Sequence, residues 1–453
     1  MKITWLGRFF QKIFQSRPVE SAKIDWETVN LIAPGLYQIF VERNFPAAVV
    51  TLENPWNKVI RDFQVQLRLQ GICDWASSSV SEIEPKGKGV VKIILPLPLN
   101  EVYGYEEKNA NFELKCCYQD ASGKKRDYSD IRTVRILAKD DMIWELDAFG
   151  NREDLSESIA AWITPRDDSV QKLIHESANN ENAKAVGGLL GYQESQHRTR
   201  VKEKYTIAAG RHVSVKLHLK QSSVVRGVLS EVVGGSGNDI RFGLLDSDEM
   251  IVLTSNMAQQ APILLKLAKS GYQIMFNTPV ESDYYMVFDN TFSVFSKKDV
   301  DTSIEIIQPL THEEIVWYQL KAIYETLQQK GCSYVSSPIS YAPGVSQRVK
   351  RPAKTLELKG GNCIDGCVLF ASCFEALSLD THIIVLPTIG HSLVAVRTWL
   401  DSKKFYIVET SVISSSSFEE SLRIANNTYS KYRDSAKRIS VAEARKKRIM
   451  PLA

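Results

Sequence analysis

One cysteine, one histidine and one glutamate follow one another in the last quarter of this 453-residue chain, in an order that suits nucleophilic catalysis. Cys363 comes directly after Asn362 and two glycines, at the start of an apolar stretch whose spacing predicts a buried helix. A helix N-terminus favours a reactive cysteine, because the positive end of the helix dipole stabilises a thiolate. Cys363 is therefore the candidate nucleophile.

His391 and Glu409 supply the two remaining parts of a catalytic triad. His391 opens a short β-type run after Gly390, and Glu409 follows the apolar run 405–408, which predicts the next strand. In serine and cysteine hydrolases the histidine takes the proton of the nucleophile and an acid orients the imidazole. We expect the helix and the two strands to converge so that the three side chains meet.

Three segments that carry these residues resemble the transglutaminase-like superfamily of cysteine peptidases and their relatives. The segments are QRVKRPAKTLELKGGNCIDGCVLFASCFEAL, IIVLPTIGHSLVAV and FYIVETSVI. The family pattern is Gly-x-Cys-x-Asp at a helix start, Gly-His at a strand start and an acid on a strand. The resemblance implies Cys363 as nucleophile, His391 as general base and Glu409 as its orienting partner. Many members of the family have Asp at the last position, so Glu409 departs from the pattern there.

Two further polar residues are expected to support the site. Asp365 matches the acid that the family places two residues after the nucleophile, and we interpret it as support for the helix start. Gln347, in SQRVKRP, is expected to line the site, and a role in binding an oxyanion is a hypothesis for it. Cys367 and Cys373 fall inside the apolar face of the helix and are expected to pack in the core.

Other interpretations of the cysteine stay open. Cys363 is an inert buried thiol in the simplest alternative, since cysteine is often only a small buried hydrophobe. Zinc is disfavoured, because Cys363 and Cys367 are spaced C-x3-C and no second cysteine pair follows. We expect neither a metal nor a cofactor.

Composition describes an ordinary globular chain of about three domains. Apolar residues make up 44% and charged residues 24% of the sequence, and the formal net charge of +3 gives no reason to expect a nucleic-acid partner. The seven cysteines are odd in number and irregularly spaced, which favours a reducing compartment over a disulfide scaffold. We therefore expect a cytoplasmic protein. Any association with a membrane depends on the N-terminal segment.

Residues 1–20 predict an amphipathic helix with aromatic and aliphatic side chains on one side and only basic charges up to Arg17. Such a helix can make peripheral contact with an anionic membrane surface. It is too short and too polar to span a bilayer, and it lacks the cleavage site of a secretory signal. Docking on a neighbouring domain or a protein partner is the alternative.

Short alternating runs separated by turn clusters predict an immunoglobulin-like β-sandwich over residues 30–140. The predicted strands are 36–41, 47–52, 63–69, 89–95, 111–118 and 132–137. This region contains no catalytic cluster, so its expected role is interaction or scaffolding.

Helical patterning after residue 150 predicts a catalytic domain in two parts, 150–198 and 310–453. SESIAAWITPRDDSVQKLIHESANN, GLLGYQ and the helix 313–331 look like pieces of a transglutaminase-like domain. The strand-rich stretch 200–309 between them predicts an inserted β-sandwich. An insert beside a catalytic cleft can gate access or recruit substrate, and a passive insertion is the alternative.

Part of the insert, SDYYMVFDNTFSVFSKKDV, resembles the GOLD (Golgi-dynamics) family of β-sandwiches. The resemblance implies a module for interaction with proteins or lipids. We expect four apolar residues of this segment in the core, on either side of a polar turn at Asp289 and Asn290. They are Val287, Phe288, Phe292 and Phe295.

Basic residues cluster near the C-terminus, where we expect a helix with a solvated basic face. They are Lys431, Arg433, Lys437, Arg438, Arg445, Lys446, Lys447 and Arg448. A phosphate-binding patch is the alternative.

These patterns together predict an α+β multidomain chain with an immunoglobulin-like β-sandwich, a papain/transglutaminase-like α+β catalytic core and a GOLD-like insert that splits the core. The predicted function is that of a cysteine peptidase that forms an acyl-enzyme with a protein substrate. Acyl transfer, as in a transglutaminase or deamidase, shares the early chemistry and stays open. So does a non-catalytic interaction scaffold. Protein partners are expected at the β-sandwich modules.

Overall fold

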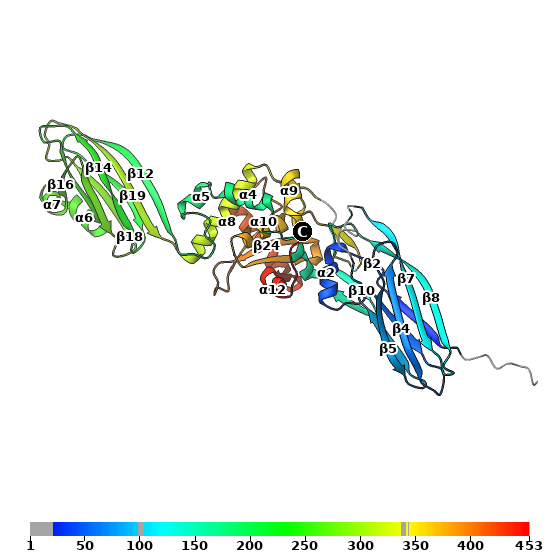
Figure 1. Cartoon of the computed structure of the whole chain (residues 1–453). Coiled ribbons are helices and arrows are strands. Elements are labelled where there is room, and N and C mark those ends of the chain that lie inside the picture. The colour runs from blue at the N-terminus through cyan, green and yellow to red at the C-terminus, as the bar shows by residue number, and fades with distance from the viewer. Residues whose placement is uncertain (1–20, 98–103, 105, 337–340, 343, 453) are drawn as a thin grey trace, which may run out of the picture.

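The structure is a computed structural model that describes residues 21–97, 104, 106–336, 341–342 and 344–452. The amphipathic helix predicted for residues 1–20 lies outside the described residues. Within the described chain, a β-sandwich, a central α+β body and a second β-sandwich follow one another (Figure 1). At this coarse level the mixed, β-rich fold class is confirmed. The described part of the chain has no helix that is long and apolar enough to cross a membrane.

The N-terminal body packs a five-stranded sheet, with the order β2-β8-β7-β4-β5, against the three-stranded sheet β1-β3-β6. The strands are β1 (Lys23–Thr28), β2 (Leu31–Ile32), β3 (Ala48–Glu53), β4 (Ile60–Leu69), β5 (Ala76–Ile83), β6 (Lys88–Ile93), β7 (Lys108–Gln119) and β8 (Lys125–Ile136). Alternate residues of β4 such as Phe63, Val65 and Leu67 are fully buried, because successive side chains of a strand point to opposite faces.

The strand predicted at 36–41 is wrong, since Pro34–Glu42 form helix α2. Pro34 begins the helix, where its restricted φ suits the first turn and its missing N–H costs no hydrogen bond. Gly35 allows a close approach to the central body, because a Cβ at this position would lie 2.9 Å from the Trp162 ring. Short apolar runs fit a strand and a helix equally well, and here packing decided between them.

The central body is built around the antiparallel sheet β25-β24-β23-β26. Its strands are β23 (Thr381–Leu386), β24 (His391–Arg397), β25 (Phe405–Val408) and β26 (Lys437–Ser440). The main helices are α4 (Asp168–Ser177), α5 (Glu181–Ala185), α8 (His312–Gln329), α9 (Pro352–Leu358), α10 (Cys363–Ala376), α11 (Phe418–Tyr432) and α12 (Val441–Lys446). Helix α10 packs against β23 and β24 and is buried along most of its length.

Short elements complete the central body and connect it to the N-terminal sandwich. They are β9 (Asp141–Ile143), β10 (Glu145–Ala148), β11 (Asn151–Asp154), η1 (Ser156–Trp162), β20 (Ser333–Tyr334), β21 (Ser346–Arg348), β22 (Gly360–Gly361), η2 (Pro387–Ile389) and η3 (Arg433–Ser435). Strand β9 pairs with β21, and one continuous hydrophobic cluster runs through the N-terminal and central bodies.

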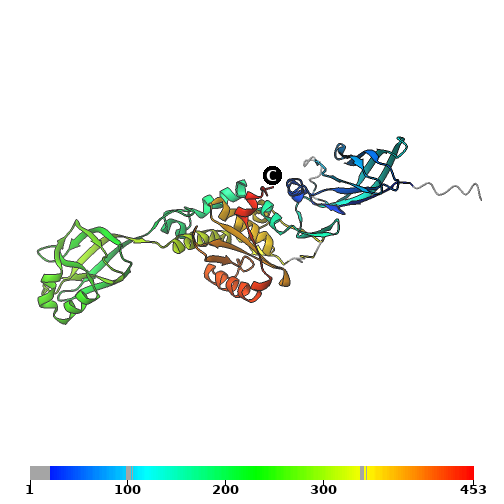
Figure 2. The same ribbon diagram turned by 90° about the horizontal axis from the view of Figure 1, so that it is seen from below.

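The second sandwich consists of two four-stranded sheets, β12-β19-β14-β17 and β13-β18-β15-β16, around a hydrophobic core of its own. Its elements are β12 (Gln196–Ile207), β13 (His212–Leu219), β14 (Val224–Val233), β15 (Asp239–Asp246), α6 (Ser247–Ser255), α7 (Met257–Leu264), β16 (Lys266–Lys269), β17 (Tyr272–Asn277), β18 (Ser282–Asp289) and β19 (Lys298–Pro309). The pairing of β12 with β19 brings both connections to the central body to one end of the sandwich, and the other end points away (Figures 1 and 2).

Two features of this sandwich differ from the sequence-based expectation. Helices α6 and α7 were not predicted, although Asp246 and Glu249 form a capping box at the start of α6. Val287 and Phe288 are fully buried as expected, but Phe292 is 36% and Phe295 94% exposed, so their placement in the core is wrong. Strand β18 ends at Asp289, and the residues after it form a loop.

Candidate active site

The three predicted triad residues converge in the central body. Cys363 is the first residue of α10, which packs against β24. His391 begins β24, and Glu409 directly follows the neighbouring strand β25. His391 Nε2 lies 2.7 Å from Glu409 Oε2, and although burial lowers the pKa of the same imidazole, the Cys363 side chain is close enough to help raise it. A cysteine, a histidine and a carboxylate are therefore arranged in the order that thiol catalysis uses.

The imidazole of His391 is held between two partners. Burial lowers the pKa of His391, but hydrogen bonds to Cys363 and Glu409 and the Glu409 charge outweigh burial and raise this pKa to about 10. Burial raises the pKa of Glu409, and the contacts with His391 bring it below its usual value. His391 and Glu409 are thus an imidazolium and a carboxylate at neutral pH. Because Nε2 binds Glu409, Nδ1 is the ring nitrogen left for the thiol.

Glu409 is fixed in place by two serines. Its carboxylate is almost completely buried, and Oε1 accepts hydrogen bonds from Ser411 N–H at 3.0 Å and Ser411 Oγ at 2.6 Å. Ser421 Oγ on α11 donates to the Glu409 carbonyl at 2.9 Å and accepts from its N–H at 3.1 Å. Backbone and side chain are therefore both held, which leaves Oε2 directed to His391.

Asn362 and Asp365 cap the helix that begins at Cys363. The Asn362 side chain accepts from Asp365 N–H at 3.0 Å, and Asp365 Oδ2 accepts from Asn362 N–H at 3.0 Å, which is a capping box. Asp365 also accepts from Lys350 N–H at 2.8 Å and from Lys350 Nζ at 2.7 Å. Asp365 is fully buried, so it acts as support and joins the segment after Gln347 to the helix start.

A glycine permits tight packing one turn after the cysteine. A Cβ at Gly366 would lie 2.6 Å from Thr410 Oγ1. Thr410 Oγ1 donates to the Cys363 carbonyl at 3.3 Å, and Thr410 directly follows Glu409 in the chain. The backbone of Cys363 is therefore tied to the segment that follows β25 and contains Glu409.

Gln347 presents an amide donor that has no hydrogen-bond partner among the described residues. Trp144 Nε1 donates to Gln347 Oε1 at 2.8 Å, and Gln347 Nε2 is buried without a hydrogen-bond partner in the described part of the chain. The Trp144 ring packs on Tyr341 with centroids 4.8 Å apart, and Tyr341 Oη donates to the His391 carbonyl at 3.2 Å. A buried N–H without an acceptor costs free energy, and an oxyanion placed there would offset that cost.

Sequence reasoning missed Trp144, Tyr341 and Lys350 as neighbours of these residues. Trp144 stands 203 positions before Gln347, and no periodic pattern links residues that far apart. For Lys350 a signal existed, because it lies within the segment that resembles the family. Its pairing with Asp365 depends on how that segment folds back onto α10.

The remaining cysteines in α10 are packed rather than poised for chemistry. Cys363, Cys367 and Cys373 are all fully buried, and burial raises the pKa of the Cys367 and Cys373 thiols. Thiols in such surroundings are inert, because the thiolate form is suppressed. The described residues contain no group of three His, Cys, Asp or Glu side chains that could hold a metal ion.

The basic residues near the C-terminus do not share one solvated helix face, so that expectation is wrong. They are distributed over α11, η3, β26 and α12 and the turn after it. Arg445 pairs with Glu375 through Nε and Nη2, each at 2.9 Å, and Lys437 Nζ lies 3.3 Å from Glu145 and 3.1 Å from Asp154. These charges attach the C-terminal segment to the central body.

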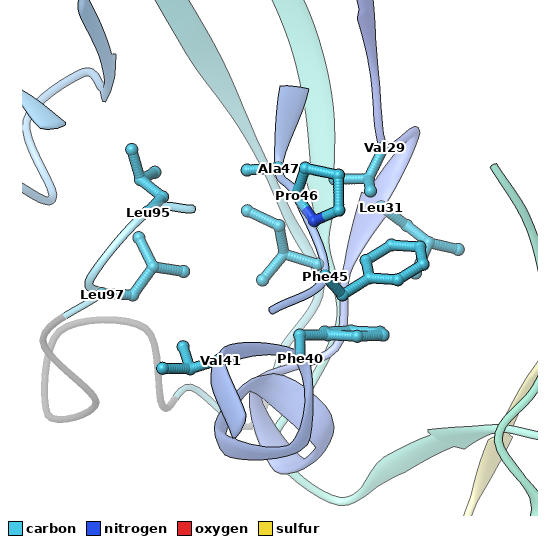
Figure 3. A pocket seen from close by; sticks show the side chains of 10 residues that line it. Val29, Leu31, Phe40, Val41, Phe45, Pro46, Ala47, Leu95 and Leu97 are labelled. Atoms are coloured by element: carbon cyan, nitrogen blue, oxygen red, sulfur yellow. The ribbon is translucent and has the colours of Figure 1, made fainter. Parts of the chain in front are cut away.

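An apolar hollow beside α2 lies in the N-terminal body rather than at the triad (Figure 3). Its lining consists of Val29, Leu31, Ile32, Phe40, Val41, Phe45, Pro46, Ala47, Leu95 and Leu97. None of these side chains titrates or acts as a nucleophile, so the hollow contributes no chemistry.

Comparisons with known proteins assign no family to the chain. No protein-family model and no curated protein matches it. A periplasmic inhibitor of g-type lysozyme from Aeromonas hydrophila is 15% identical, with 25% of this chain and 87% of that chain covered and a TM-score of 0.16. A putative late embryogenesis abundant protein is 12% identical, with coverages of 29% and 79% and a TM-score of 0.18. A β-sandwich carbohydrate-binding module is 10% identical, with coverages of 64% and 98% and a TM-score of 0.14. At such TM-scores these likenesses carry no argument.

Proposed function

We propose that the chain is a cysteine peptidase of the transglutaminase-like superfamily, with Cys363 as nucleophile, His391 as general base and Glu409 as the acid that orients it. The observation that carries the proposal is the imidazole of His391, bound by Glu409 at 2.7 Å and, against the effect of burial, raised in pKa by Cys363, which begins a helix, and by Glu409. The unpartnered Nε2 of Gln347 adds support, because acyl transfer needs a donor for the developing oxyanion.

The proposed reaction has two halves. The Cys363 thiolate attacks the carbonyl carbon of a peptide bond, the carbonyl oxygen becomes an oxyanion that accepts a hydrogen bond from Gln347 Nε2, and His391 gives its proton to the departing amine as the C–N bond breaks. Water then attacks the thioester while His391 accepts a proton from it. Collapse of this second oxyanion breaks the C–S bond, releases the acid and regenerates the thiolate–imidazolium pair.

In this proposal the central body is a papain/transglutaminase-like domain formed by residues 150–198 and 310–453. Residues 30–140 are the immunoglobulin-like module and 200–309 the GOLD-like insert. The adjacent ends of β12 and β19 support an insertion, because the insert needs only one attachment point on the central body. The substrate is a protein, and the two β-sandwiches are the surfaces through which protein partners bind.

The test compares the wild type with Cys363→Ala by proteome-wide mapping of new N-termini. New termini with a common residue preference are expected only with the wild type. Cys367→Ala is the matched control, since it removes a buried thiol one turn further along α10, and it should cleave as the wild type does.

A labelled primary amine in the same reaction distinguishes the two acyl-transfer outcomes. Incorporation of the amine that requires Cys363, without new N-termini, would replace the peptidase assignment by acyl transfer. Absence of both products with every variant would contradict the catalytic proposal and leave an interaction scaffold.

A further inference from the structure

A loop at one end of the second sandwich holds large apolar side chains in water. It comprises residues 290–297, between β18 and β19, and we call it the tip loop. Phe295 is 94%, Val294 75% and Phe292 36% exposed, and Val233, at the end of the neighbouring strand β14, is 47% exposed. Single exposed apolar residues are ordinary, whereas adjoining ones on a projecting loop mark an interaction site.

Hydrogen bonds give the tip loop a defined shape. The buried Asn290 side chain donates from Nδ2 to three backbone carbonyls, two at the turn that follows β12 and one at Ser296. Ser293 Oγ donates to the Ser296 carbonyl at 3.0 Å. The exposure of Phe295 is therefore built into the folded loop, and an ordered loop pays little conformational entropy when a partner covers it.

Basic side chains flank the tip loop. Arg211 is exposed, and its carbonyl accepts a hydrogen bond from Asn290 N–H at 2.9 Å. Lys297 keeps 69% of its side chain exposed beside Asp299. A third cation, Lys298, is buried, and its Nζ forms an ion pair with Asp239 Oδ1 at 2.9 Å. Arg211 and Lys297 are thus the exposed cations beside the apolar tip, and Lys297 Nζ lies 3.6 Å from Asp299 Oδ2.

The tip loop lies at the end of the sandwich that is far from the proposed catalytic site. Strand β12 runs 12 residues from Gln196, next to the central body, to Ile207, next to the tip loop. At about 3.3 Å per residue this is a span of roughly 40 Å. Figures 1 and 2 both show this sandwich extending away from the central body.

A convex tip of this kind fits a deformable surface better than a folded protein. Val294 and Phe295 project rather than line a groove, so a protein partner would need a matching pocket, whereas the interfacial layer of a bilayer accommodates such side chains directly. Cations next to inserted apolar residues add attraction to anionic headgroups.

We propose that the tip loop binds membranes containing anionic lipids, with Val294 and Phe295 inserted among the acyl chains and Arg211 and Lys297 at the headgroups. The central body is then held roughly 40 Å from the bilayer by the length of β12. This membrane site does not depend on the proposed cleavage reaction, and it is separate from the contact predicted for residues 1–20.

The test is sedimentation of the full-length protein with vesicles of phosphatidylcholine alone and of phosphatidylcholine with phosphatidylserine. The wild type is expected to bind the anionic vesicles more tightly. Val294→Ser with Phe295→Ser is expected to lower this affinity about tenfold or more, because burial of two apolar side chains is lost. Lys297→Glu should weaken binding at low salt and have a smaller effect at high salt.

Ile263→Ser is the matched control, since Ile263 is 75% exposed on α7 of the same sandwich but outside the tip loop. It is expected to bind as the wild type does. Residues 1–20 are present in every protein, so differences between variants report on the loop. The melting temperature of each variant checks that folding is intact.

Three results would overturn the proposal. One is a wild type that ignores both kinds of vesicle, and another is equal binding to neutral and anionic vesicles. The third is a double variant that keeps full vesicle affinity while wild type binds. If the Val294→Ser, Phe295→Ser variant instead fails to bind a protein that the wild type captures, the tip loop is a protein-docking element.

Discussion

Trp144 donates a buried hydrogen bond of 2.8 Å from Nε1 to Oε1 of Gln347, across 203 positions of sequence. An indole N–H can only donate, so its partner must be the amide oxygen. The bond therefore leaves the amide nitrogen of Gln347 as the free end, buried and without a partner among the described residues. A donor oriented in advance is what stabilisation of an oxyanion requires.

Trp144→Phe is expected to lower kcat for peptide cleavage, because the Gln347 amide loses the contact that orients it. Gln347→Ala should lower kcat by about 10²–10³-fold, the usual loss for one oxyanion donor. Alkylation of Cys363 by iodoacetamide forms no oxyanion, so both variants should react at the wild-type rate. Mass spectrometry of the labelled peptide provides this second measurement.

Trp162→Phe is the matched control for this prediction. Trp162 is fully buried, and its Nε1 has no hydrogen-bond partner within the described residues, so the change deletes an indole without breaking such a bond. Its kcat should match that of the wild type. A parallel fall in alkylation and turnover in Trp144→Phe would indicate general damage to the site.

Glu409→Gln is expected to shift the alkaline limit of activity to lower pH. Although burial lowers the pKa of His391, its hydrogen bonds to Cys363 and Glu409 raise this pKa to about 10. The proposed reaction needs the imidazolium to protonate the leaving amine, and the variant lacks the carboxylate that favours it. The measurement is kcat/KM against pH, with partly exposed Glu420→Gln on α11 as control. Identical alkaline limbs in both variants would contradict the prediction.

The same ion pair makes stability depend on pH. His391 has a raised folded pKa, so its contribution is complete below about 6.5 and is lost as pH rises through about 10. Glu409 has a lowered folded pKa, so its contribution is complete above 4.5 and is lost as pH falls through the folded value. The difference in unfolding free energy between wild type and Glu409→Gln should be largest between pH 4.5 and about pH 6.5, where both contributions are complete. Urea unfolding at several pH values tests this, and a difference that stays constant to pH 10 would contradict it.

Asp365→Ala is expected to reduce the free energy of unfolding by about 3 kcal/mol, because it leaves Lys350 without its buried partner and removes the cap of α10. Glu357→Ala is the control, since its pair with Lys354 is exposed and should contribute less than about 0.5 kcal/mol. Equal unfolding free energies for both variants would contradict the supporting role.

Arg445→Ala is expected to destabilise the protein by about 3 kcal/mol. Besides its pair with Glu375, Arg445 donates to the carbonyls of Ala160 and Ile163 at 2.9 and 2.8 Å, which ties α12 to the chain around η1. Arg445→Lys should recover little, since lysine lacks the planar fork. Exposed Arg423, paired with Glu420 on α11, offers the control, and Arg423→Ala should change stability by less than about 0.5 kcal/mol. A solvated basic face would instead show no difference between the two arginines.

Much of the candidate site was predictable because its signals are local. Cys363 follows a capping asparagine at a helix start, and His391 and Glu409 stand at the start and just past the end of short strands. Each pattern is contained in a few consecutive residues, so helical period, strand period and cap chemistry identify it without reference to the rest of the chain. The alternation of the sandwich strands was readable for the same reason.

Contacts between distant segments were decided only by folding. The sequence around Gln347 gives no sign of its contact with Trp144, and the sequence around Arg445 gives no sign of its contact with Ala160. The apolar run after Pro34 fits a strand as well as it fits the helix that packs on Trp162. Phe295 is a large apolar residue of the kind that usually packs in a core. The turn at Asn290 nevertheless follows the end of the strand and leaves the Phe295 side chain exposed to water. Local propensity selects an element, whereas burial and hydrogen-bond partners depend on which surfaces meet, and that is a property of the whole packed chain.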